Sequence, residues 1–171
     1  PIRGQVSQLT LEPGFTLLAD YMPESSGVAL GLWFYTGSAW EGPSERGLSH
    51  FVEHMVFKGA GNRDAAELSS AIDREGGYLN AFTERDTVCI HCTMPKDKAR
   101  LALDIIMDMT YRPHFRSDEF EREKDIIANE ILSAGDDLEE AGHDEFYAMT
   151  YPDHAAGCKI AGSVDDVRSA R

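Results

Sequence analysis

The chain has 171 residues, the length of one ordinary domain, and it is 42% hydrophobic and 27% charged, which is typical of a globular protein with a substantial core. Its 30 acidic and 16 basic residues give a formal charge of −14. Because such a chain is repelled by phosphate backbones, we expect no nucleic-acid partner.

The first part of the chain is predicted to be β-structure. Residues 6–11 alternate between apolar and polar side chains, and a turn at Glu12-Pro13-Gly14 leads into a second strand over 15–20. Residues 28–36 are rich in aliphatic and aromatic side chains, which predicts a buried central strand. A polar loop with Gly and Pro follows over 37–47.

Helices are predicted next. Residues 48–57 have apolar side chains at helical spacing, and Lys58-Gly59 supplies a cation and a glycine where a helix ends. Asp64 is followed three residues later by Glu67, which predicts a capping box at the start of a second helix. Gly76-Gly77 ends that helix.

The middle of the chain continues with two strands and a helix. The strands are predicted over 78–82 and 87–93, joined by a polar turn. A helix is predicted over 96–109 and is broken by Arg112-Pro113. Its predicted apolar face consists of Leu101, Leu103, Ile105, Ile106 and Met109.

A long helix is predicted from Ser117 to about residue 133, resuming beyond Gly135. The last twenty or so residues are predicted to be a loop and the start of another helix, without a stop signal. We therefore expect residues 1–171 to be a single domain that is cut before its natural end. The interspersed strands and hairpin-compatible turns predict an α+β fold, a mixed, mainly antiparallel sheet with helices packed on one face in two layers.

The sequence shows no segment for a membrane or for secretion. No apolar run approaches the roughly 18 residues that a spanning helix needs, and no signal-peptide core follows Pro1. We therefore expect no membrane partner and a soluble protein, in the cytoplasm or, if a targeting peptide has been removed, in the mitochondrial matrix or periplasm. Three cysteines argue against a disulfide framework, and Cys89 and Cys92 lack the second pair that a four-ligand zinc site needs.

One stretch, His50-Phe51-Val52-Glu53-His54, predicts metal chemistry. Residues four apart share a helix face, so His50 and His54 can offer imidazole nitrogens to one ion. Glu53 lies beside that face and can take a proton from a metal-bound water, as in the related His-Glu-x-x-His order. Two histidines leave a zinc ion under-coordinated, because a catalytic site normally has three protein ligands and a water.

The predicted long helix offers a third ligand. Glu123 and Glu130 lie two turns apart on nearly the same face. Apolar neighbours predict that the helix is largely buried: Ile126, Ile127, Ile131 and Leu132. A buried carboxylate is costly unless it is paired or binds a metal, so Glu130 is our candidate ligand and Glu123 a candidate second-layer partner of a ligating histidine. The alternative is a pair of surface histidines and a solvated Glu130.

Residues 47–59 resemble the signature of the pitrilysin/insulinase family of zinc peptidases, which includes the mitochondrial processing peptidase and its bacterial relatives. Residues 37–41 and 76–83 match the family's segments before the metal helix and after the second helix. The 75 residues between His54 and Glu130 are the separation that the family uses for its glutamate ligand. Residues 154–162 match more loosely, so the resemblance covers essentially the whole chain.

The resemblance implies a zinc-dependent endopeptidase domain with one Zn²⁺ per chain, in which Glu53 is the catalytic base. It places Asn80, Ala81 and Phe82 at a sheet edge that lines the active site, where an extended peptide adds as a strand. Active members consist of two homologous halves that close around a peptide, and this chain would be part of the first. The alternative is a zinc-binding but inactive partner subunit or structural domain, although inactive partners typically lose motif residues that are intact here.

The acidic character of the chain bears on its substrate. The run 136–140, continued by Asp144-Glu145, follows the predicted metal helix. Together with the charge of −14, it predicts a preference for basic peptides, and the alternative is a solvated face. His91, His114 and His143 have no partner at metal spacing, so we expect them to be structural.

Overall fold

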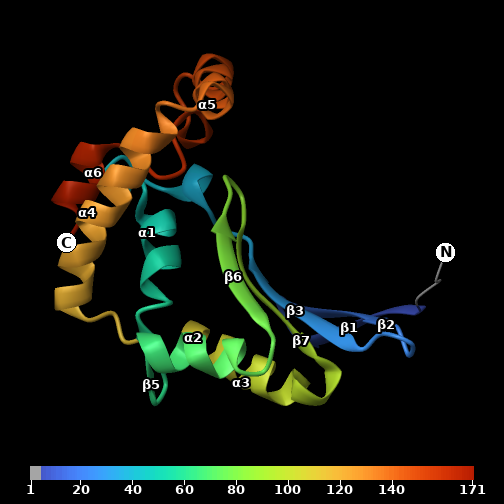
Figure 1. Ribbon diagram of the computed structural model, residues 1–171. Coiled ribbons are helices and arrows are strands. Elements are labelled where there is room, and N and C mark those ends of the chain that lie inside the picture. Colours follow the sequence, from blue (N-terminus) through green and yellow to red (C-terminus); the bar gives the residue numbers. More distant parts are fainter. Residues whose placement is uncertain (1–4) are drawn as a thin grey trace.

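The computed structural model describes residues 5–171, so the start of the chain, where we expect no signal-peptide core, lies outside the described residues. A three-stranded sheet in the order β3-β7-β6 forms the centre of the fold, with both pairs of strands antiparallel. Helices α1, α2 and α3 pack on one face of this sheet (Figure 1). The predicted α+β class is therefore confirmed. The strands are β3 (Gly27–Phe34), β6 (Tyr78–Thr83) and β7 (Val88–Pro95).

The position predicted for the first strand of this sheet is wrong. β3 is an edge strand, and β7 is the central one. Alternate residues of β3 pack on the core, whereas Ala29, Gly31 and Trp33 face the opposite side and are exposed. The residues on both faces of β3 are apolar or small. The sequence therefore lacks the alternation of apolar and polar residues that marks a half-buried strand.

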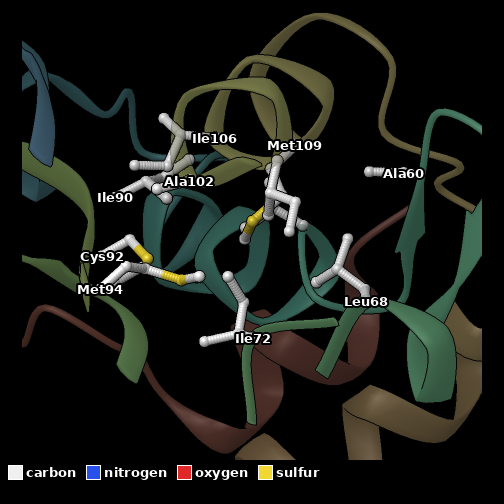
Figure 2. Close-up of a cluster of buried hydrophobic side chains, with 12 residues drawn as sticks. Ala60, Leu68, Ile72, Ile90, Cys92, Met94, Ala102, Ile106 and Met109 are labelled. Atoms are coloured by element: carbon white, nitrogen blue, oxygen red, sulfur yellow. The ribbon is translucent and has the colours of Figure 1, made fainter. Parts of the chain in front are cut away.

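The main core lies between the sheet and helices α2 (Ala65–Asp73) and α3 (Ala99–Tyr111) (Figure 2). Buried residues of α3 follow the helical spacing i, i+3, i+4 and i+7: Ala102, Ile105, Ile106 and Met109. Leu103 was predicted on this face but is 45% exposed, because it lies about 100° around the helix from Ala102. The small Ala102 takes the position against the sheet.

Local signals place the helix starts. The capping box at Asp64 is confirmed, since its side chain accepts from Glu67 N and the Glu67 side chain accepts from Asp64 N. The long helix α4 runs over Ser117–Ala134, as predicted, and the chain resumes as α5 (Leu138–Thr150), capped by Asp137. The last helix is α6 (Val164–Ser169), and short 3-10 turns lie at η1 (Ser38–Trp40), η2 (Lys96–Lys98) and η3 (Ala155–Gly157).

The predicted hairpin near the start of the chain is confirmed as β1 (Gln5–Glu12) and β2 (Phe15–Tyr21), and it extends away from the helices (Figure 1). Gly14 occupies its turn at φ 85°, a conformation that favours glycine. A second small hairpin pairs β4 (Gly59–Ala60) with β5 (Arg63–Asp64). Among residues 5–171, no helix combines the length and the apolar composition that crossing a bilayer requires.

The predicted strand cysteines are buried on β7. Cys92 belongs to the main core, and Cys89 is paired in register with Trp33 on the other face. Burial raises the pKa of Cys89 to about 11, so its thiol stays protonated near neutral pH. A metal ligand would have to be a thiolate, which favours a packing role for this residue.

Candidate metal centre

Helix α1 (Leu48–Met55) presents the two motif histidines, and it lies between strand β6 and helix α4 (Figure 1). His50 and His54 are one turn apart, with ring centroids separated by 4.7 Å. A neighbouring face of α1, one residue further around the helix, packs on α4 through a second small core, in which the rings of Phe51 and Phe120 stack at 4.4 Å. This packing fixes the distance between the histidines and the side chains of α4.

Helix α4 brings Glu130 to both histidines. Its carboxylate oxygens lie 3.2 Å from Nε2 of His54 and 3.6 Å from Nε2 of His50. Ligand atoms of all three residues lie within 4.8 Å of one another. Two atoms bound to one tetrahedral zinc ion at about 2 Å are roughly 3.3 Å apart, so these distances fit a zinc ion with two nitrogen ligands and one oxygen ligand.

A buried carboxylate behind the site sets the orientation of His54. Glu123 is 1% exposed, and its Oε2 lies 3.0 Å from Nδ1 of His54. An ionised carboxylate can only accept, so Nδ1 carries the proton and Nε2 keeps its lone pair for a metal. Lys58 Nζ lies 2.7 Å from the other Glu123 oxygen and balances the buried charge.

His50 is held neutral by its surroundings. Burial lowers its pKa from 6.5, and the nearby His54 lowers that pKa further, against smaller raising effects of Glu130, Glu53 and Glu41. A neutral imidazole is the form that binds a metal ion, so protonation does not compete with binding near neutral pH.

The burial predicted for the long helix is wrong at Glu130, the candidate ligand. The Glu130 side chain is 50% exposed, and Ile126 and Leu132 are exposed as well, whereas Ile127 is fully buried. The apolar residues of α4 therefore occupy more than one face of the helix. The carboxylate that is costly to bury is Glu123, which is paired with both His54 and Lys58.

A cavity of about 760 Å³ lies beside two of the three candidate ligands, His50 and Glu130. Glu53 lines it together with His50 and Glu130, so its carboxylate faces the same space as the predicted ligands. The other walls come from the end of β6, helix α5 and the loop over 159–162. A molecule bound in this cavity would therefore contact Glu53, His50 and Glu130 at once.

Of the three predicted substrate-binding residues, only Phe82 lines this cavity. Ala81 points into the main core, and Asn80 lies on the opposite face, where its side chain donates to Tyr78 Oη at 2.7 Å. In the described part of the chain, β6 pairs with β7 alone, so its other edge offers unpaired backbone groups. Main-chain hydrogen bonds to an added strand remain possible along this edge.

Sequence reasoning missed Arg85, which joins the turn between β6 and β7 to α5. Its Nε donates to Ala156 O at 2.8 Å, and its guanidinium lies 3.5 Å above the ring of Tyr147. Arg85 also lines the cavity, so it holds α5 as a wall of the site. The sequence signals only a polar turn here, because the contact depends on a helix about sixty residues further along the chain.

A family model described as Insulinase (Peptidase family M16) matches residues 16–163. This chain belongs to the insulinase family. The resemblance found in the sequence is thus confirmed. The insulinase-family chain is 34% identical over 164 residues to a Bacillus subtilis protein named uncharacterized zinc protease YmxG, covering 96% of this chain and 40% of that protein. It is 33% identical to the uncharacterized zinc protease ML0855 of Mycobacterium leprae, covering 95% of this chain and 36% of that protein.

Solved structures show the same fold at lower sequence identity. A protease from Helicobacter pylori superposes with a TM-score of 0.90 at 21% identity, covering 99% of this chain and 41% of that one. An inactive peptidase M16 domain from Pseudomonas fluorescens superposes with a TM-score of 0.88 at 17% identity, covering 98% of this chain and 41% of that one. Pitrilysin superposes with a TM-score of 0.82 at 22% identity, covering 96% of this chain and 18% of the pitrilysin chain. The chain spans about two fifths of the length of the curated relatives that it matches.

Proposed function

We propose that this chain is the metal-binding part of a zinc-dependent endopeptidase, with one Zn²⁺ held by His50, His54 and Glu130. The observation that supports this most is the convergence of those three side chains, from two helices, to within 4.8 Å. The names of the relatives, which are called zinc proteases, point to the same metal. The site is therefore a nitrogen- and oxygen-ligand set with room for a further ligand on the cavity side.

The chain's own residues suffice for the proton transfers of peptide hydrolysis. Zinc, when bound, acts as a Lewis acid that lowers the pKa of a water to about 7. The Glu53 carboxylate accepts the proton that the attacking water loses, and it then delivers this proton to the nitrogen of the leaving amine. The open edge of β6 holds the peptide extended beside the ligands, and Phe82 shields the reacting carbonyl from bulk water.

A zinc-binding but inactive partner or structural domain is the second candidate. The similar fold of an inactive M16 domain from Pseudomonas fluorescens shows that the fold also occurs without activity. Glu53 favours the enzyme, because this carboxylate is present and lines the cavity beside the ligands. Peptide cleavage by the protein beside its Glu53→Gln variant is the test. Bound zinc without any cleavage would favour the inactive candidate.

We further propose that residues 1–171 act as a single N-terminal half-domain and that a second homologous half completes the site. Residues 1–171 alone are expected to bind zinc but to cleave peptides about 100-fold more slowly than a form with the second half, because a peptide held about 1 Å out of place reacts that much more slowly. The measurement is cleavage rate per bound zinc for both forms with one peptide. Equal rates would show that the second half is dispensable.

Basic peptides are the proposed preferred substrates, and α5 supplies the reason. Glu139 and Glu140 line the cavity, and no cation of the described part of the chain pairs with them. Asp144 is different, because Arg85 and Lys159 lie 3.6 Å and 3.5 Å from its carboxylate. The free negative charge near the site is therefore at the start of α5.

A peptide with Arg or Lys near the cut is expected to be cleaved about twofold to fivefold more efficiently than its neutral analogue, the range of an exposed ion pair. The preference should shrink as salt approaches about 1 M, where the Debye length is about 3 Å. The preference is measured as the ratio of kcat/KM for the basic peptide to kcat/KM for its neutral analogue, in the unmodified protein and in Glu140→Gln. The control is Glu24→Gln, an exposed residue between β2 and β3 that changes the net charge equally. Indifference to basic residues at low salt would rule the preference out.

A further inference from the structure

The helix that bears both histidines begins without a side-chain cap of its own. Its N-cap residue is Gly47, at φ 80°, and it has no side chain to accept from the first amides of α1. The first amides of a helix have no partner within the helix, and leaving them unpaired away from water costs free energy. His50 is the third residue of α1, so it lies in this first turn.

Glu41 supplies the missing acceptors from six residues before the N-cap. Its Oε2 accepts from Gly47 N at 2.8 Å, and its Oε1 accepts from Ser49 N at 2.7 Å. The residue is only 9% exposed, so both hydrogen bonds are screened little by solvent. A carboxylate at this end of a helix is also favoured by the helix dipole.

The segment just before Glu41 is fixed by the turn that joins β6 to β7. Glu41 directly follows η1, whose Ser38 N and Ala39 N donate to backbone oxygens of the turn between β6 and β7, at 3.2 Å and 2.8 Å. The same turn ends the strand beside the cavity. Glu41 therefore connects the start of α1 to the end of β6.

No other residue type at the N-cap could replace this arrangement. A Cβ on Gly47 would lie 2.4 Å from Ala161 O, so the loop that lines the cavity leaves no space for a capping side chain. The positive φ of Gly47 also disfavours any residue with a Cβ. The first turn of α1 therefore depends on a cap that comes from outside the helix.

The two histidines are held in different ways. His54 is oriented through its ring by Glu123, as described above. The Nδ1 atom of His50 is buried and has no hydrogen-bond partner among the described residues, so no ring contact of this kind orients it. The position of His50 relative to Glu130 is therefore set by packing and by the backbone of the first helical turn.

We propose that Glu41 is a positioning residue that holds the first turn of α1, and with it His50, in place for the metal. The proposal rests on the zinc site proposed above. Without Glu41, the first turn frays, Nε2 of His50 moves away from Glu130, and zinc loses one of its three protein ligands. Glu41 itself contacts neither metal nor substrate, so its effect passes entirely through the backbone.

The test is the zinc dissociation constant of the protein and of its Glu41→Ala and Glu41→Gln variants, with Glu45→Ala as the matched control. Glu45 is in the same loop, and its exposed side chain accepts from Gly42 N at 2.9 Å. Only its backbone oxygen, which alanine keeps, accepts from Leu48 N of α1. Glu41→Ala is expected to weaken zinc binding about 10–100-fold, as loss of an outer-layer partner of a metal ligand typically does. The zinc affinity of Glu41→Gln should lie between those of Glu41→Ala and the unmodified protein. Its amide oxygen can still accept one backbone hydrogen bond, whereas its amide nitrogen cannot accept the other.

Hydrogen exchange in the metal-free protein supplies a second readout. The amides of Ser49 and His50 are expected to exchange faster in both Glu41 variants than in Glu45→Ala, because, of these two side chains, Glu41 alone accepts from an amide of the first turn. Glu41→Gln preserves size and keeps the comparison possible if Glu41→Ala does not fold. Zinc affinities of the Glu41 variants equal to that of Glu45→Ala would overturn the positioning role. Absence of zinc binding by the unmodified protein would instead overturn the proposed function.

Discussion

Replacing Glu53 with glutamine is expected to leave zinc bound and to slow peptide cleavage by about 10²–10⁴-fold, the usual contribution of a general acid–base group. Glu53 is not one of the three residues, His50, His54 and Glu130, whose ligand atoms lie within 4.8 Å of one another. Replacing its carboxylate therefore removes no proposed zinc ligand. It lines the cavity beside His50, where a water would lose its proton. An amide has nearly the same shape but cannot take up that proton. Metal content and cleavage rate, measured on the same sample, check both halves of the expectation.

The matched control for this variant is Glu121→Gln. Glu121 is an exposed carboxylate of α4 that pairs with Lys124, so its substitution changes the charge equally and leaves the cavity intact. Cleavage by this control should stay within about twofold of that of the unmodified protein, since exposed ion pairs contribute little. If Glu53→Gln released its zinc, Glu53 would be a ligand, and the role of Glu130 would have to be reassigned.

The parts of the fold that follow from local chemistry were predicted well. The capping box at Asp64 and Glu67 is a pattern of two residues three positions apart, and both of its hydrogen bonds form within one turn. The turn at Gly14 and the hairpin around it depend on neighbouring residues in the same way. Such features need no knowledge of what packs against them.

The errors concern which face is buried, and that is decided by distant parts of the chain. Trp33 is a large apolar residue of the kind found in cores, yet it lies on the face of β3 that points away from the main core and is 56% exposed. Leu132 has the same apolar character and is exposed, whereas the charged Glu123 on the same helix is buried. Apolar content therefore predicts reliably that a segment is a helix or a strand. It predicts less reliably which side of that segment faces the core.

The candidate site was predictable to the extent that it lies on one helix. The spacing of His50 and His54 places them on a common face, whatever surrounds α1. The meeting of α1 with α4 comes from tertiary packing, and Glu130 was chosen partly on a burial that the structure does not show. Lys58 was predicted only as the cation at a helix end, and neither Lys58 nor Glu41 was predicted to support the site. Their partners lie far along the chain or are backbone amides, and neither kind of contact leaves a pattern in the sequence.

Alanine at His50, His54 or Glu130 is expected to weaken zinc binding by more than about 100-fold, beyond the usual cost of losing an outer-layer partner. Each variant leaves two protein ligands where a catalytic zinc site normally has three. Glu123→Gln should be milder, about 10–100-fold, because it disturbs the orientation of His54 and removes no ligand. The measurement is zinc affinity by competition with a chelator, on variants shown by circular dichroism to be folded.

The ranking of these variants separates a metal site from a cluster of surface charges. Asn129→Ala is the control, because Asn129 precedes Glu130 on α4, is exposed and offers no carboxylate or imidazole ligand to the site. Its zinc affinity should equal that of the unmodified protein. In an adventitious surface site, exposed histidines and carboxylates would substitute for one another, so single alanines would cost only a few-fold each. Full zinc retention in His50→Ala or Glu130→Ala would therefore remove the three-ligand assignment, since no other described group lies close enough to replace the lost one.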